Sequence, residues 1–269
     1  MKTDISIQKN IPGVIYSHLE HSTKIGEQFI PQHGLCYIVN GTIKVVDGDT
    51  TKTFGSGEII LYRKNFLAKF LKIPSEGEKF LSITVMFDTQ SLEEFSRNFN
   101  AVYQDHYDAT DAVVTLKRTI LLSNYFATLM PYFNSSLPEE LVNLKRQEAL
   151  MLILQAQPEL VNLLFNFAQP GKIDLEEFMQ RNFRFNVSLE KLAFLTGRSL
   201  ASFKRDFKTA FNTSPVRWLQ NKRLQEAFYL INEKKMKPSA FYHEIGFESL
   251  SHFSTSFKRK YGVNPSTIK

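Results

Sequence analysis

Aromatic residues at helical spacing occur twice near the carboxy terminus, and the two series lie fifty positions apart. The six residues are, in order, Phe203, Phe207, Phe211, Phe253, Phe257 and Tyr261. Residues at i, i+4 and i+8 lie on one side of a helix, so each series predicts an amphipathic helix that buries its rings. A serine that can cap the helix, Ser199 or Ser249, precedes each series, and Pro215 or Pro265 follows it. The pattern therefore predicts two helices of the same design.

A shorter supporting helix is predicted in front of each of these helices. The first begins after Ser188 and ends at Gly197, and the second covers 239–245 and ends at Gly246. Between the two copies, the 18 residues 215–232 predict a long helix that begins with a proline, which is favoured at the first helical position. Such a helix would span roughly 27 Å, which comes close to the ~34 Å between successive major-groove faces of DNA once the flanking turns are added. These elements predict two helix-turn-helix units joined by a linking helix.

The side chains expected opposite the aromatic rings are mostly short, polar or cationic, as reading a DNA major groove requires. With the two capping serines, they are Ser199, Ala201, Ser202, Lys204, Arg205, Lys208 and Thr209 in the first helix, and Ser249, Ser251, His252, Thr255, Lys258 and Arg259 in the second. We therefore expect this part of the chain to bind double-stranded DNA.

Individual roles follow from the chemistry of these side chains. Arg205 is the best candidate for reading a base, because a guanidinium can bind O6 and N7 of guanine together. The cations Lys204, Lys208, Lys258 and Arg259 are expected to meet phosphates. The helix amino termini at Ser199 and Ser249 offer backbone N–H groups to phosphates as well.

The same region resembles a known family of regulators. The stretches that carry the resemblance are Ser214–Leu219, Gly246–Phe253, Phe257-Lys258 and Gly262–Ser266. In this order, over about residues 174–269, they resemble the AraC/XylS-type transcription regulators. The run Tyr242–Ile245, and an amino-terminal half without a ligand-binding signature, are most similar to the ExsA-like branch. The resemblance implies transcription activation, RNA polymerase as a partner and a homodimer.

The chain departs from the family pattern at two places. Many relatives have Ile-Ala where this chain has Phe241-Tyr242, so the second supporting helix must accommodate a large ring. Many also carry arginine at the position of Thr255, whose side chain is too short for a bidentate contact with guanine. We therefore expect the first recognition helix to discriminate bases and the second mainly to anchor the DNA backbone.

Charge is unevenly distributed along the chain. Residues 172–269 contain 18 Lys+Arg and 9 Asp+Glu, a net of +9, whereas the whole chain has a net charge of +6. The preceding residues therefore carry a net of −3, from 15 basic and 18 acidic side chains. A basic carboxy-terminal part attracts phosphate without regard to sequence.

The first ninety residues predict strands. Short runs rich in β-branched and aromatic residues alternate with glycine-containing turns, a pattern typical of an all-β barrel or jelly roll. The expected strands are Leu35–Val39, Thr42–Val46, Glu58–Tyr62, Ala68–Leu71 and Phe80–Phe87, after a polar lead-in segment that holds His18 and His21. The order of the turns around Gly41, Gly48 and Gly57 resembles the cupin-like sensor domains found in many relatives.

Residues 90–166 predict helices over 91–99, 113–133 and 138–156, with a further short one from Pro158. Along the third helix, a stripe at three- and four-residue steps is formed by Leu141, Leu144, Glu148, Met151 and Leu152. This stripe either packs on the barrel or forms a subunit interface. Breaker residues at 169–173 predict the domain boundary.

The sequence argues against an enzyme. Metal-binding cupins need several histidines and a carboxylate, whereas this region offers His33 with Leu35 where a second histidine would be expected. His33 is therefore expected to be a rim or hydrogen-bonded residue, Glu58 a turn residue, and Cys36, the single cysteine, a buried thiol. We expect no cofactor, no metal and no catalytic site.

Together these patterns predict an α+β protein in a reducing cytoplasm, with no membrane segment. It would comprise a cupin-like β-barrel (1–90), a helical dimerisation segment (91–168), a linker (169–173) and an all-α DNA-binding domain (174–269). One alternative is a protein that binds or processes a small molecule in an open barrel. Another is a regulator controlled by a protein partner, in which the barrel is filled by Phe54, Tyr62, Phe66 and Phe70.

Overall fold

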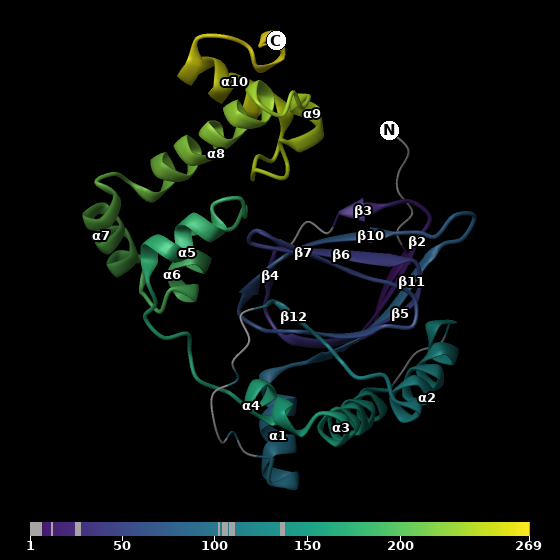
Figure 1. Ribbon diagram of the computed structural model, residues 1–269. Coiled ribbons are helices and arrows are strands. Elements are labelled where there is room, and N and C mark those ends of the chain that lie inside the picture. The colour runs from purple at the N-terminus through teal and green to yellow at the C-terminus, as the bar shows by residue number, and fades with distance from the viewer. Residues whose placement is uncertain are drawn as a thin grey trace. The chain divides into compact units, whose positions relative to one another are not determined.

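The computed structural model describes residues 7–11, 13–24, 28–101, 103, 107, 111–134 and 138–268. Contacts divide the chain into two compact units, Met1–Ala168 and Gln169–Lys269, here called the N-terminal unit and the C-terminal unit. The N-terminal unit contains sheets and helices, and the C-terminal unit is helical among its described residues (Figure 1). The predicted fold class, a sheet-rich first part and an all-α second part, is confirmed.

Antiparallel sheets form the framework of the N-terminal unit. One has six strands in the order β1-β2-β11-β5-β8-β12, one has four in the order β3-β10-β6-β7, and β4 pairs with β9. The strands are β1 (Ile7–Ile11), β2 (Val14–Leu19), β3 (Thr23–Lys24), β4 (Phe29–Ile30), β5 (His33–Asn40), β6 (Thr42–Asp47), β7 (Thr50–Phe54), β8 (Ile59–Tyr62), β9 (Phe66–Leu67), β10 (Lys69–Ile73), β11 (Phe80–Phe87) and β12 (Val113–Thr115).

Side chains from both large sheets fill the space between them. Phe54 and Phe70 are buried there, with Tyr62 and Phe66 packed against them half-buried. These four aromatics are the ones expected in a filled barrel. The Lys72 ammonium is also buried on this side and donates to Ser17 Oγ over 2.7 Å.

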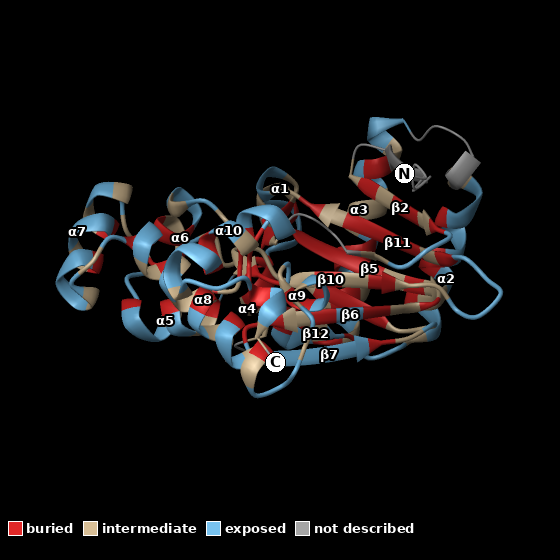
Figure 2. Ribbon diagram, turned by 90° about the horizontal axis from the view of Figure 1, so that it is seen from above, coloured by how far each residue is buried: buried red, intermediate tan, exposed pale blue. Residues whose placement is uncertain are grey.

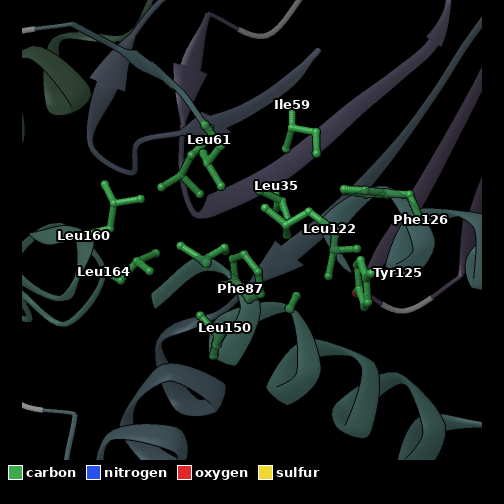
Figure 3. Close-up of a cluster of buried hydrophobic side chains, with 14 of the residues drawn as sticks. Leu35, Ile59, Leu61, Phe87, Leu122, Tyr125, Phe126, Leu150, Leu160 and Leu164 are labelled. Atoms are coloured by element: carbon green, nitrogen blue, oxygen red, sulfur yellow. The ribbon is translucent and has the colours of Figure 1, made fainter. Parts of the chain in front are cut away.

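Helices cover the outer face of the six-stranded sheet (Figure 1). They are α1 (Thr89–Phe99), α2 (Ile120–Leu129), α3 (Glu139–Ala156) and α4 (Val161–Leu164), with 3-10 turns at Met130–Asn134 and Pro158–Leu160. Residues that alternate with the inward ones on β5 and β8, such as Leu35 and Leu61, point outward and pack on these helices (Figure 3). Alternation along a strand thus gives this unit two cores, one on each face of one sheet.

Two expectations for the N-terminal unit were wrong. The stretch 113–133 was expected to be helical, but Val113–Thr115 form β12 and α2 begins only at Ile120. β-Branched residues fit a pleated strand, and here they pair with β8. The polar lead-in segment also contains a strand, β2, which places His18 opposite Leu81 of β11.

The C-terminal unit consists of α5 (Leu175–Asn182), α6 (Leu189–Leu195), α7 (Leu200–Phe211), α8 (Pro215–Asn232), α9 (Pro238–Phe241), α10 (Leu250–Tyr261) and a 3-10 turn at Pro265–Thr267. The linking helix α8 has the bounds that the sequence predicts. The second supporting helix is shorter than expected: α9 ends at Phe241, and turns continue to Gly246. The Phe241 ring is fully buried and meets Phe253 edge-on, with 5.9 Å between ring centroids.

Candidate nucleic-acid interface

The first recognition helix, α7, buries its aromatic side and exposes the side predicted to read DNA. Ser199 Oγ accepts from the Ser202 N–H over 3.2 Å and so caps the helix. Phe203 and Phe207 are fully buried, and the Phe207 ring stacks on Phe211 with centroids 4.3 Å apart. Among the predicted residues, those left exposed are Ser199, Ala201, Lys204, Arg205, Lys208 and Thr209, whereas Ser202 is half-buried. Figure 2 shows α7 as mostly exposed, with buried segments on one side.

The second recognition helix, α10, repeats this arrangement. Ser249 Oγ accepts from the His252 N–H over 3.2 Å, and the rings of Phe253 and Phe257 are fully buried. The residues predicted to face DNA are exposed: Ser249, Ser251, His252, Thr255, Lys258 and Arg259. A hollow of about 360 Å³ lies against the carboxy-terminal half of this helix, and its lining includes two residues that sequence reasoning missed, Ser254 and Asn264.

A carboxylate on α7, Asp206, joins three cations around the first recognition helix. Arg198 Nε donates to Asp206 Oδ2 over 3.2 Å, Lys172 Nζ lies 3.4 Å from the same oxygen, and Arg205 Nη2 lies 3.4 Å from Oδ1. The hydrogen bond from Arg198, and then the interaction with Lys172, lower the pKa of the Asp206 carboxyl. Sequence reasoning missed this cluster, because Lys172 lies 34 positions before Asp206.

Part of the segment expected to be a linker is packed on the first helix-turn-helix. Gly197 has φ of +64°, and a Cβ at this position would overlap the backbone of Gly171 and Lys172. Arg198 Nη1 also donates to the Ile173 carbonyl over 3.0 Å. Residues 171–173 therefore belong structurally with the supporting helix α6 and the recognition helix α7.

His33, the histidine considered as a metal ligand, is buried in β5. Its Nδ1 lies 3.3 Å from the backbone N–H of Lys64, and burial lowers the pKa of its ring to about 3. The Glu58 carboxylate accepts from the Gly55 N–H, as a turn residue would. Among the described residues, no group of three or more His, Cys, Asp or Glu is placed to hold a metal ion.

The stripe expected on α3 divides into two parts. Leu141 and Leu152 are half-buried and pack against the core of their own chain. Leu144, Glu148 and Met151 are exposed, with Leu144 at 61% and Met151 at 44% of their full accessible surface. The deeply buried side of α3 carries other residues: Val142, Ala149, Leu150 and Ile153.

Two family models match this chain. Residues 33–163 match the ExsA N-terminal regulatory domain, and residues 192–269 match a helix-turn-helix domain. The chain is 24% identical over 240 residues to the HTH-type transcriptional regulator ExsA of Pseudomonas aeruginosa, covering 87% of this chain and 85% of that one. It is 26% identical over 266 residues to the virulence regulon transcriptional activator VirF of Yersinia enterocolitica, covering 95% and 92%.

The chain belongs to the AraC-type transcription regulators. The resemblance inferred from its sequence, including the ExsA-like branch, is confirmed, and so is its role as a transcription regulator with a DNA-binding domain of this type. These relatives are regulators of transcription rather than enzymes. Among solved structures, ToxT from Vibrio cholerae aligns over 96% of this chain and 97% of its own, with 14% identity and a TM-score of 0.47.

The charge of the C-terminal unit agrees with binding to DNA. Its C-terminal unit carries the basic excess that attraction to phosphate requires. Within the described parts of the chain, none of the helices combines the length and the apolar character needed to cross a bilayer.

Proposed function

We propose that this protein is a homodimeric transcription activator that reads two successive major grooves of one duplex with α7 and α10. Arg205 would read guanine, and the cations Lys204, Lys208, Lys258 and Arg259 would bind phosphates. After binding its operator, the protein would contact RNA polymerase.

The observation that supports this proposal best is the pair of capped, exposed recognition helices that pack against α8, with α7 at Trp218 near its start and α10 at Phe228 further along. The linking helix has 18 residues and so a length of roughly 27 Å. Asn212, with φ of +51°, ends α7, and Ser214 caps α8 two residues later, so the turn between the helices is short. A short turn and a continuous linking helix are suited to hold two recognition helices on one side of a duplex.

Activation is supported by the relatives. VirF of Yersinia enterocolitica is named a transcriptional activator, and this chain aligns with nearly its whole length. Transcription with a purified bacterial RNA polymerase, from a promoter that carries the selected operator, tests this step. We expect more transcript when the protein is added, whereas a decrease would indicate a repressor.

A homodimer is supported by the exposed part of the α3 stripe. Leu144 and Met151 lie seven residues apart on one side of the helix, and neither is covered by its own chain. Exposed apolar residues at helical spacing can pack against the same stripe of a second copy, as a two-fold symmetric interface requires.

The filled space between the sheets favours a protein rather than a small molecule as the effector. Phe54, Phe70 and Phe80 occupy it together with aliphatic side chains. A ligand of ordinary size would have to displace several of these side chains.

Selection of DNA by the full-length protein tests the proposed reading of two grooves. A randomised duplex library is enriched for bound sequences, and the selected duplex is mapped by hydroxyl-radical footprinting. We expect two protected stretches on one face of the duplex, about 10 base pairs apart from centre to centre. A single protected stretch, or no enrichment, would contradict the proposal.

A further inference from the structure

Arg223, in the middle of the linking helix, binds both helix-turn-helix units at once. Its Nε donates to the Phe183 carbonyl over 2.8 Å and its Nη2 to the Phe185 carbonyl over 2.8 Å. Its Nη1 donates to the Gly246 carbonyl over 2.9 Å. Phe183 and Phe185 lie between α5 and α6 in the first unit, whereas Gly246 lies in the turn before α10 in the second.

The chemistry of this contact requires an arginine. A guanidinium is planar and directs several N–H groups in fixed directions, so it can satisfy three carbonyls that lie around it. Burial lowers the pKa of Arg223 to about 10, which leaves the side chain charged at neutral pH. A lysine ammonium is a single point donor on a flexible stem and cannot take the place of all three nitrogens.

The geometry around Gly246 is adapted to this guanidinium. Gly246 has φ of +94°, and a Cβ at this position would lie 2.7 Å from Arg223 Nε and 2.9 Å from the Arg184 carbonyl. Gly246 therefore lets the turn before α10 approach both the Arg223 guanidinium and the loop between α5 and α6 of the first helix-turn-helix unit. Three residues later, Ser249 caps α10, so the position of this turn determines where α10 begins.

Further contacts join the same segments. Asn186 Nδ2 donates to Glu248 Oε1 over 2.9 Å, which links the loop of the first unit directly to the turn before α10. Arg184 Nη2 lies 2.9 Å from Glu226 Oε1 on α8, and Gln220 Nε2 donates to Ser256 Oγ on α10 over 3.1 Å. The two units are therefore held against one another by side chains as well as joined by α8.

We infer that Arg223 is a positioning residue that fixes α10 relative to α7 and thereby sets the half-site spacing that the protein accepts. The inference rests on the proposed reading of two grooves. Two linked recognition helices gain affinity only when both bind their half-sites at the same time. A rigid connection between the helices restricts that gain to one distance between the half-sites. Inserting one base pair moves a half-site by about 3.4 Å and rotates it by about 35°, so a fixed pair of readers loses one of its contacts.

The test uses the full-length protein and a duplex selected by the wild type from a randomised library. Binding is measured on the selected duplex and on duplexes with one or two base pairs added or removed between the half-sites. For the wild type we expect roughly tenfold or greater weakening at a one-base-pair change, since simultaneous binding is lost. For Arg223→Met we expect weaker binding to the selected duplex. The ratio between spacings, which is the dissociation constant at the changed spacing divided by that at the selected spacing, should fall to about two, because the two recognition helices now move independently.

Two further variants separate positioning from charge and from folding. Arg217→Met removes the same charge from an exposed position on the same helix, so its ratio between spacings should equal that of the wild type. Arg223→Lys keeps the charge and most of the stem but not the three directed donors, and we expect its ratio to lie between those of the wild type and Arg223→Met. If Arg223→Met does not fold, Arg223→Lys decides the question.

The outcomes are distinguishable. A folded Arg223→Met or Arg223→Lys protein with the ratio of the wild type would overturn the inference, and so would an equal loss of affinity at every spacing. If the wild type itself binds all spacings equally, the proposed reading of two grooves fails, and the role of Arg223 fails with it. A ratio that falls only in the Arg223 variants supports the role stated here.

Discussion

The guanidinium of Arg205 lies 3.4 Å from the carboxylate of Asp206, the next residue on α7, while its side chain stays 75% exposed. An ion pair this exposed contributes little free energy, because water and salt screen it. Asp206 also accepts a hydrogen bond from Arg198, whose side chain is only 8% exposed. Asp206 is therefore held by Arg198, and Arg205 is able to exchange its weak contact for a base.

Replacing Arg205 with alanine should relax sequence preference without abolishing DNA binding. Losing a bidentate contact to guanine costs about 1–3 kcal/mol on the specific site and little on random DNA. Binding of the full-length variant to the selected operator and to a random duplex, at one salt concentration, measures the difference. An equal loss on both duplexes would identify Arg205 as a phosphate contact. Lys208→Ala is the matched control, since losing an exposed phosphate contact should weaken both by similar factors.

The two recognition helices should contribute unequally to base discrimination. Arg205 on α7 corresponds to Thr255 on α10, whose hydroxyl cannot make a bidentate contact. Lys258 and Arg259 instead line the hollow beside the end of α10, where a phosphate would find two cations. Base-pair substitutions in the half-site that faces α7 should therefore cost about 1–3 kcal/mol each, and those facing α10 less. A scan of every operator position checks this expectation, and equal penalties would show that His252 and its neighbours read bases too.

Replacing Leu144 with glutamate should dissociate the proposed dimer and leave the subunit folded. Leu144 is 61% exposed on α3, so the change removes little packing within the chain, but it places a charge in an apolar interface. We expect the dissociation constant of the dimer to rise by about tenfold or more, which corresponds to about 1.4 kcal/mol. Sedimentation equilibrium measures the change. Val216→Glu is the control, because Val216 is 62% exposed and lies in the C-terminal unit. An unchanged constant for Leu144→Glu would rule out this face of α3 as the interface.

Acid should destabilise the N-terminal unit through His33. Burial, and then the charge of Lys64, lower the pKa of its ring from 6.5 to about 3, although a hydrogen bond with the Tyr62 carbonyl acts in the opposite direction. The folded state therefore keeps His33 neutral, whereas the unfolded state binds a proton below about pH 6.5. Stability present above that pH should be lost as the pH falls toward 3, by up to about 1.4 kcal/mol per pH unit.

Hydrogen exchange in β5 and β11, followed from neutral pH to about pH 5, measures this loss of stability. In His33→Asn the amide oxygen can replace Nδ1 as an acceptor for the Lys64 N–H, but the side chain does not titrate. This variant should lack most of the pH dependence. Fluorescence of Trp218, the single tryptophan, reports on the C-terminal unit and should not follow the titration of His33. Equal pH dependence in His33→Asn and the wild type would contradict this account.

The parts of the fold that local pattern determines were predictable from the sequence. The caps Ser199 and Ser249 and the bounds of α8 were predicted correctly, because caps, proline and apolar spacing act over a few residues. β12 was missed because its three residues become a strand only by pairing with β8, about fifty positions away. β2 was missed because Ser17 interrupts its apolar pattern, and the partner of Ser17, Lys72, comes from a distant strand.

In the candidate site, too, features set by local sequence were predictable and features set by distant contacts were not. Exposure of the residues predicted to face DNA follows from helical periodicity, and nearly all of them are exposed in the structure. The contacts of Arg223 involve backbone carbonyls, which every residue possesses, and no pattern of side chains marks them. The hollow next to Asn264 depends on how the chain turns after α10, which local sequence does not determine.

The packing of Gly171 against Gly197 decides where this protein tolerates recombination with its relatives. A chimera that receives a foreign regulatory region must keep residues 171–173 with the DNA-binding part, because the supporting and recognition helices of the first unit are built around them. A junction placed after Ala168 preserves the contact between Gly171 and Gly197. A junction placed after Lys172 replaces Gly171 and Lys172 with a foreign segment, whose backbone must then fit equally closely against Gly197. Exchange of whole regulatory regions between family members is therefore constrained at two glycines that are not among the residues expected to meet DNA.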